Sequence, residues 1–288
     1  ISLTGAKPIF IDCNSLNGTI DISKIEKKIT KKTKAISLVH HLGNPSNMRV
    51  VIRIAKKNNL LILEDCATAL GARINNKHVG NFGNAGVFSF YPIKHITTGE
   101  GGIIISNNKK IIDKINMLKA FGVNKSYLKR RTPGEYDANL LGLNYRMNEI
   151  SAAIGIEQIK RFPKFLAIRK KNYNYLVSKI TKKKSFNIIK FENKPFYGSY
   201  YCLCVVINDS KINRLDIINK LNKEGVGTSI YYPKPIPEMS YYKKKYQYTS
   251  SEFKNAEKFS YRSIALPLGT HLTKKDLNLI VSSINKVL

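Results

Sequence analysis

The feature that most constrains this sequence is an alternation of short apolar runs with a stretch of helical periodicity over residues 34–106. Four runs are apolar almost throughout and read as strands, over residues 34–40, 60–65, 85–91 and 103–106. Between the first two, Val50, Val51, Ile54 and Ala55 have the spacing of one helix face. Such alternation is typical of βαβ units with a parallel sheet covered on both faces. The sequence therefore predicts an α/β fold.

Further segments extend this pattern in both directions. Before it, residues 7–12 read as a strand and residues 22–29 as a short helix. After it, we expect a helix over 109–121, a polar loop to about 137, and a long helix that opens near Asn144, breaks at Pro163 and resumes to Ile180. The remaining expected elements are a strand at 198–207, a helix at 212–224, a strand at 264–267 and a helix at 276–288. We therefore expect a large domain over residues 1–162, and a linking helix with a small α+β domain over residues 163–288.

Composition narrows the classes of partner. The 288 residues carry a formal net charge of +30, which attracts polyanions or phosphorylated small molecules. The lysines are scattered and accompany no recognisable nucleic-acid module, so we expect no nucleic-acid partner. The four cysteines form no C-x-x-C pair and no zinc spacing, which predicts no metal site and reduced thiols in a cytoplasmic protein. No apolar run approaches transmembrane length, so we expect no membrane partner.

Residues 88–102 hold a single lysine between two expected strands. Lys94 follows Pro92, where one apolar run ends, and precedes a Thr/Gly turn that leads into the next run. A lysine in this place is partly desolvated, which favours its neutral amine and makes Lys94 a candidate Schiff-base nucleophile. The alternative interpretation is an ordinary exposed lysine in a lysine-rich chain.

Polar residues follow three expected strands: His40, Asp65 and, beyond Ser89, Lys94. In open α/β sheets, ligands bind at the carboxyl ends of the strands. An acid and a lysine at neighbouring strand ends suit pyridoxal phosphate, because the lysine binds its aldehyde and the acid keeps its ring nitrogen protonated. Each residue alone also has a structural interpretation, since a strand-terminal Asp often caps a turn or helix and a strand-terminal His is often a satisfied structural residue.

Several motifs, taken in order, resemble the DegT-type nucleotide-sugar aminotransferases. Members of this family depend on pyridoxal phosphate and have fold type I, the fold of aspartate aminotransferase. The motifs are GAKPIFID (5–12), VHHLGNP (39–45), EDCATALGA (64–72), VGNFG (79–83), FSFYPIKHITTGEGG (88–102), GLNYRMNE (142–149) and AA (152–153). Residues 231–235 and 266–267 match more loosely. The resemblance covers nearly the whole chain and implies a mainly parallel central sheet with helices on both faces and a smaller C-terminal α+β domain.

The resemblance also implies roles for the matching positions. Lys94 would form the internal aldimine with pyridoxal 5'-phosphate and act as the base that moves the proton. Asp65 would pair with the pyridine nitrogen, and Ser89 would hydrogen-bond the cofactor phosphate. Thr68 stands where the family usually has Gln or His near the 3-oxygen of the cofactor, so a hydroxyl of shorter reach takes that place.

Other positions carry further implications. Asn144 would reach the phosphate of the cofactor in a partner subunit, which implies a homodimer with shared active sites; alternatively, Asn144 is the N-cap of the helix that opens there. His40 belongs to the strand-end motif and would lie near the cofactor. Pro237 stands where relatives often have a His that contacts the substrate. The family's N-terminal segment, with its phosphate-cradling Gly-Thr turn, is missing before Ile1, so we expect a fragment or a naturally short form.

The implied activity is the transfer of an amino group, from glutamate, to a keto group of a nucleotide-linked sugar in polysaccharide, lipopolysaccharide or amino-sugar biosynthesis. Two alternatives stay open: a non-catalytic or regulatory member of the fold, and a pyridoxal-phosphate-dependent sugar dehydratase. In the dehydratases a His replaces the lysine, so Lys94 argues against that alternative. We expect the sugar to be chosen by loops such as residues 124–136 and 231–242.

Overall fold

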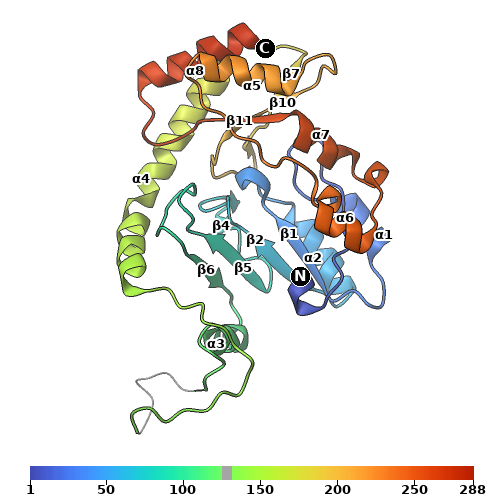
Figure 1. The fold of residues 1–288 in the computed structure, drawn as a ribbon, viewed down its shortest axis with the longest axis vertical. Helices are drawn as coiled ribbons and strands as arrows, with labels where there is room; N and C mark the ends of the chain where they lie inside the picture. The colour runs from blue at the N-terminus through green and yellow to red at the C-terminus, as the bar shows by residue number, and fades with distance from the viewer. Residues whose placement is uncertain (125–131) are drawn as a thin grey trace.

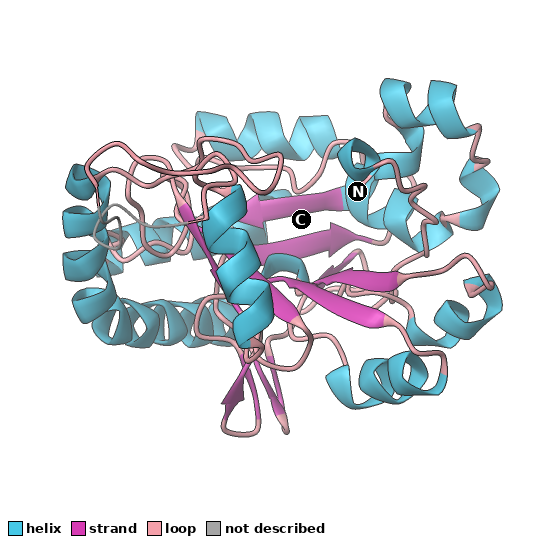
Figure 2. Ribbon diagram, turned by 90° about the horizontal axis from the view of Figure 1, so that it is seen from below, coloured by secondary structure: helices cyan, strands magenta, loops and turns pink. Residues whose placement is uncertain are grey.

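The computed structural model describes residues 1–124 and 132–288, so the expected specificity loop at 124–136 lies partly outside the described residues. The described chain forms three small sheets, with most of the helices at the periphery (Figures 1 and 2). No helix within the described ranges is both long and apolar enough to span a bilayer.

The central sheet contains the strands that the apolar runs predicted. Its order is β1-β2-β5-β6, formed by β1 (Ala35–Val39), β2 (Leu61–Asp65), β5 (Ala85–Ser89) and β6 (Gly102–Ile105). The first three strands are parallel, and β6 is antiparallel to β5. This mainly parallel sheet confirms the predicted α/β fold. Val39 pairs with Asp65 and Asp65 with Val87, so the three parallel strands end at one edge.

The two faces of this sheet differ in how well they are covered. Ile36, Leu38 and Ile62 are buried in one cluster with residues of α2 (Met48–Lys57), which connects β1 to β2. On the opposite face Leu61 is 56% exposed, and Val39 is exposed with it. We expected helices over both faces, but the connection from β2 to β5 contains a short hairpin, β3 (Arg73–Ile74) and β4 (Lys77–His78), and no helix. A stretch of apolar sheet is therefore open within the described residues.

The C-terminal half has its own antiparallel sheet of order β11-β10-β7. Its strands are β7 (Phe186–Ile188), β10 (Leu203–Ile207) and β11 (Ser263–Leu266), and the helices around it are α5 (Arg214–Lys223), α7 (Lys254–Arg262) and α8 (Lys274–Val287). Leu203 is fully buried and shares a cluster with Leu221 of α5 and Ile284 of α8. The expected strand at 264–267 and the helices at 212–224 and 276–288 are thus confirmed, with ends shifted by up to two residues.

One long helix, α4 (Glu149–Lys179), joins the two halves along one side of the molecule (Figure 1). The predicted break at Pro163 is wrong, because the helix runs through this residue. Proline removes one helical hydrogen bond, but Phe162 and Phe165 on either side of it pack against the same buried cluster of the N-terminal half. This packing keeps the helix continuous. The predicted division between residues 162 and 163 falls inside α4 and stays a prediction.

A small sheet also joins the two halves. The hairpin of β3 and β4 pairs with β9 (Phe196–Tyr197), which in turn pairs with β8 (Glu192–Asn193). The other helical elements of the described residues are η1 (Ser2–Thr4), η2 (Ile22–Lys24), α1 (Ile25–Lys28), η3 (His41–Gly43), α3 (Lys109–Leu118), η5 (Ile236–Glu238), α6 (Ser240–Tyr246) and η6 (Ser250–Glu252). The expected helix at 109–121 therefore ends three residues early, at Leu118.

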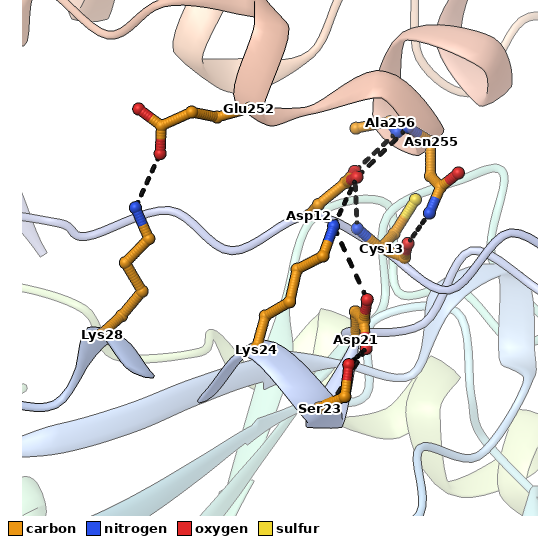
Figure 3. Close-up of polar contacts among 9 residues, drawn as sticks. All are labelled: Asp12, Cys13, Asp21, Ser23, Lys24, Lys28, Glu252, Asn255 and Ala256. Carbon is orange, nitrogen blue, oxygen red and sulfur yellow. Dashed lines mark hydrogen bonds and ion pairs between the residues drawn. The ribbon is translucent and has the colours of Figure 1, made fainter. Parts of the chain in front are cut away.

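The expected strand at residues 7–12 is absent from the described sheets, and side chains anchor this segment instead. The Phe10 ring lies 5.1 Å from the Tyr248 ring, centroid to centroid. Asp12 is 3% exposed, and its carboxylate accepts hydrogen bonds from the amides of Asn255 and Ala256 in the first turn of α7. The Lys24 ammonium lies 3.1 Å from the same carboxylate (Figure 3). Asp12 therefore caps a helix that starts about 240 residues later in the chain.

The expected strand at 198–207 is shorter than predicted, since β10 begins only at Leu203. The preceding residues leave the sheet: Tyr200 has a φ of 55°, and the amide of Ser199 bonds the carbonyl of Gly43 at 3.1 Å. An aromatic-rich run fits a strand by composition, but here the backbone bonds a distant loop.

We predict that Asp12→Ala lowers the free energy of unfolding by about 2–3 kcal/mol, because it removes a helix cap and leaves buried donors without an acceptor. Chemical denaturation measures this loss. Asp113→Ala is the control, because it removes only an exposed ion pair with Lys109 and should cost no more than ~0.5 kcal/mol. Equal effects of the two substitutions would contradict the capping role.

Candidate cofactor site at the strand ends

The carboxyl ends of β2 and β5 bring two of the predicted residues to one face. Asp65 is the last residue of β2, and Ser89 is the last residue of β5. Asp65 pairs with Val87, and side chains alternate along a strand, so Asp65 and Ser89 project from the same, open face. The apolar runs predicted the parallel pairing of these strands, and the observed register places the acid and the hydroxyl on one face of the sheet.

Lys94 lies in the turn that follows β5. Its amide donates to the carbonyl of Tyr91 at 2.9 Å, and its Nζ lies 5.4 Å from the centroid of the Tyr201 ring. Burial lowers the pKa of Lys94, and the negative charge of Asp65 partly opposes this shift. Asp65 and Lys94 are therefore close enough to influence each other, and the amine is easier to deprotonate than that of an exposed lysine.

The Asp65 carboxylate faces two groups besides Lys94. Its Oδ1 accepts a hydrogen bond from the amide of Ala67 at 2.9 Å. Burial, followed by the charge of Asp65, raises the pKa of Tyr232. Asp65, Lys94 and Tyr232 thus share one electrostatic environment, in which the tyrosine stays protonated.

The two predicted hydroxyl residues are held differently. The Ser89 Oγ accepts a hydrogen bond from the amide of Tyr91 at 3.3 Å, which leaves its own proton to be donated. Thr68 is buried, and its hydroxyl donates a long bond of 3.4 Å to the carbonyl of His40. Ser89 is therefore ready to bind an acceptor, whereas Thr68 must first give up a weak bond.

His40 lies on the covered face of the sheet, where hydrogen bonds within the protein hold its ring. It is 0% exposed; its Nδ1 accepts from the amide of Ser46, so its Nε2 donates to Glu64 at 3.0 Å. Burial acts to raise the pKa of Glu64, but the bonds from His40 and from the amides of Gly83 and Gly80 outweigh it and lower that pKa. His40 therefore lies beneath the strand end, with both ring nitrogens engaged.

His40 and Glu64 also belong to a cluster of three residues of metal-ligating type. Donor atoms of His40, Glu64 and Cys66 lie within 4.8 Å of one another, although the sequence showed no metal-ligand spacing. The Glu64 carboxylate already accepts bonds from His40 and three backbone amides. Because these donors satisfy the carboxylate, the group is explained as a buried hydrogen-bond network.

Asn144 lies apart from the strand-end residues. Its side chain is exposed and accepts a bond from the Arg146 Nε at 3.1 Å. Its interpretation as the cap of α4 is wrong, because Asn148 caps that helix by accepting from the amide of Ser151. No described contact joins Asn144 to Asp65, Ser89 or Lys94 of its own chain.

Beside Lys94 lies a cavity of about 360 Å³ that sequence reasoning missed. Its lining includes Ile93, Arg169, Tyr201, Thr228, Tyr231 and His271. Most of these residues belong to the C-terminal half and stand in no motif with fixed spacing. The aromatic run near residue 200, which predicted only a strand, is the signal in the sequence that points to this cavity.

The donor set at the strand ends fits pyridoxal phosphate. The half-buried amine of Lys94 suits its aldehyde, the Asp65 carboxylate suits its basic ring nitrogen, and the Ser89 hydroxyl suits its phosphate. Asp65 and Ser89 project from one face of the sheet, and the charge of Asp65 acts on Lys94. The residues present therefore match the chemistry of the group.

The fold and these residues define an aminotransferase of fold type I, a class that uses pyridoxal phosphate. A statistical model of the DegT/DnrJ/EryC1/StrS aminotransferase family matches residues 1–285, and the chain belongs to this family. The predicted family, enzyme class and cofactor are thereby confirmed.

Individual relatives agree with this assignment. GDP-perosamine synthase of Escherichia coli is 34% identical over 294 residues, which are 99% of this chain and 74% of that protein. UDP-4-amino-4,6-dideoxy-N-acetyl-beta-L-altrosamine transaminase of Campylobacter jejuni is 30% identical over 291 residues, again 99% and 74%. The solved structure of Helicobacter pylori PseC, an aminotransferase involved in the biosynthesis of pseudoaminic acid, superposes with a TM-score of 0.92 at 28% identity, covering 99% of this chain and 75% of that one.

We predict that Asp65→Asn lowers the pKa of Lys94 further, because it removes the charge that opposes the effect of burial. The pH dependence of trace acetylation at Lys94 in cofactor-free protein, read by mass spectrometry, measures this pKa. The exposed Lys109 serves as the internal reference. An unchanged or raised Lys94 pKa in the variant would contradict the coupling.

Proposed function

We propose that this protein transfers an amino group from an amino acid, glutamate, to a keto group of a nucleotide-linked sugar. The observation that carries the proposal is a half-buried lysine that shares its environment with Asp65, within a chain of the DegT/DnrJ/EryC1/StrS family. Two relatives at 30% identity or more are named for a GDP-linked and a UDP-linked amino sugar, which supports this substrate class.

Four residues of the chain have separate roles in the proposed reaction. When bound, pyridoxal phosphate supplies an aldehyde that joins to amines and a ring that withdraws electrons. In our proposal the Lys94 Nζ holds the cofactor and carries the proton that moves during the transfer. Asp65 keeps a proton on the ring nitrogen, and the Ser89 Oγ donates to the phosphate. The Thr68 hydroxyl turns from the carbonyl of His40 to the ring oxygen.

Burial of Lys94 serves this chemistry directly. A lowered pKa increases the fraction of neutral amine, which is the form that attacks an aldehyde and accepts a proton. The opposing charge of Asp65 favours the protonated amine and limits the shift. Lys94 also separates this chain from sugar dehydratases that have a His in its place.

We further propose a homodimer with shared sites. The segment before α4 and the first turns of that helix carry exposed apolar side chains, at Leu141, Leu143, Tyr145, Ile150 and Ile154. Apolar surface of this extent is typical of an interaction site. Asn144 lies within this segment, so its amide would face the partner subunit and reach the cofactor phosphate there.

The proposed reaction belongs to polysaccharide, lipopolysaccharide or amino-sugar biosynthesis in the cytoplasm. All four cysteines are free thiols, as is usual in reducing compartments. The +30 net charge favours an anionic substrate such as a sugar linked to a nucleoside diphosphate.

We predict that pyridoxal phosphate gives the wild-type protein a visible absorption band, and that borohydride then fixes the cofactor on the peptide that contains Lys94. Lys94→Ala should lose both properties, because it removes the nucleophile. Lys109→Ala, at an exposed lysine, is the control and should keep both. A colourless wild-type protein, or colour that survives Lys94→Ala unchanged, overturns the proposal. Glutamate with a panel of nucleotide-linked keto sugars then identifies the substrate.

We also predict that the wild-type protein sediments with twice the 32.6 kDa mass of one chain. Replacing Ile150 and Ile154 together by Glu should yield monomers, because the charges are costly to bury in an apolar contact. Leu215→Glu, at a residue of α5 that is 58% exposed, is the control and should leave the dimer intact. Sedimentation velocity distinguishes these states, and a monomeric wild-type protein would refute the shared site.

A further inference from the structure

Ser199 bonds three loops that follow the parallel strands of the central sheet. It is 0% exposed and lies in the segment that leads into β10. Its amide donates to the carbonyl of Gly43 at 3.1 Å, and its hydroxyl donates to the carbonyl of Thr68 at 2.7 Å. Its carbonyl oxygen accepts from the His95 Nε2 at 2.8 Å. We call this group of four residues the Ser199 clasp.

Each loop held by the clasp also carries a strand-end residue discussed above. Gly43 follows β1 and His40, Thr68 follows β2 and Asp65, and His95 is the neighbour of Lys94 after β5. Ser199 itself comes from the other half of the chain, 131 residues beyond Thr68. One residue outside the sheet therefore ties together the loops that bear the acid and the amine.

The packing around the clasp leaves little room for adjustment. Gly43 has a φ of 89°, and a Cβ on it would lie 1.9 Å from the Ser199 Oγ. The His95 ring packs 5.6 Å from the Tyr201 ring and 6.2 Å from the Phe162 ring, centroid to centroid. The three loops are thus held by contact as well as by hydrogen bonds.

The His95 ring is held in its neutral form where it bonds Ser199. Burial lowers the pKa of His95 to about 3, and the positive charge of Arg169 lowers it too. The ring is therefore neutral; its Nε2 donates to Ser199, and its Nδ1 is buried without a hydrogen-bond partner. A buried ring nitrogen without a partner is a cost that the fold tolerates for the sake of this bond.

We propose that Ser199 and His95 are positioning residues, which set the spacing between Asp65 and Lys94 that cofactor binding requires. This inference rests on the proposed function, because it assumes that these two groups hold one rigid ring. Asp65 and Lys94 act on separate atoms of that ring, so a shift of one loop against the other by ~1 Å weakens both contacts. The clasp bonds the loop of Asp65 through Thr68 and the loop of Lys94 through His95.

Two substitutions test the clasp and leave Asp65, Ser89 and Lys94 unchanged. Ser199→Ala removes the hydroxyl bond to Thr68 and keeps the two backbone bonds. His95→Phe removes the bond to the Ser199 carbonyl and keeps an aromatic ring against Tyr201 and Phe162. Ser106→Ala is the matched control, because the Ser106 hydroxyl bonds the carbonyl of Asn84 at 2.5 Å, away from the strand ends that carry the site.

Three measurements are made on each protein. Absorbance titration gives the dissociation constant for pyridoxal phosphate, visible circular dichroism reports how the bound cofactor is oriented, and thermal unfolding of the cofactor-free protein reports stability. We expect Ser199→Ala and His95→Phe each to raise the dissociation constant about tenfold and to change the dichroism, as loss of roughly one buried hydrogen bond would do. Ser106→Ala should lower stability and leave both cofactor readouts unchanged.

The outcomes separate this inference from the proposed function. If wild-type protein binds pyridoxal phosphate on Lys94 and both variants behave like Ser106→Ala, the clasp is purely structural and the inference is overturned, while the function stands. If the wild-type protein fails to bind the cofactor on Lys94, the function and the inference fall together. If Ser199→Ala does not fold, His95→Phe decides the matter by itself.

Discussion

The arrangement of the strands and loops around the carboxyl ends of the central sheet depends on one buried negative charge, the carboxylate of Glu64. Its Oε2 accepts from His40 and from the amide of Gly80, and its Oε1 accepts from the amides of Phe82 and Gly83. An unpaired buried carboxylate costs several kcal/mol, so these donors must stay in place while the protein is folded. Because His40 follows β1, Glu64 itself lies in β2 and the donating amides precede β5, one charge joins three neighbouring strands.

Two consecutive acids at the end of β2 have different roles because a strand alternates its faces. Glu64 points to the face covered by α2 and binds the protein itself, whereas Asp65 points to the open face and acts on Lys94. Their order along the chain shows that the two side chains point apart. The packing of α2 decides which of them is buried, and that information lies in residues 48–57 and not in the acids.

Local patterns were sufficient for the central sheet and for part of the site. The apolar runs predicted β1, β2, β5 and β6, and the parallel register placed Asp65 and Ser89 together. Local patterns do not predict interactions between residues that are far apart in the sequence. His95 and Ser199 are 104 residues apart, and no spacing rule joins them.

Packing also overrode some local patterns. Residues 7–12 have the composition of a strand but are anchored by Asp12. Pro163 stays helical because the phenylalanines on both sides of it are packed. Asn144 has the residue type of a cap, but the helix begins four residues later, where the Asn148 side chain accepts from the amide of Ser151.

The bonds between Ser199 and the three loops have a consequence for how the protein is synthesised. The strands of the central sheet are complete once residue 105 has left the ribosome, but the loops at their ends stay untied until Ser199 follows. Contacts of such sequence separation form late, since a long loop must be closed first. A nascent chain can therefore form the sheet well before the loops at its carboxyl ends are bonded to Ser199, and a chain terminated near residue 190 would lack these bonds.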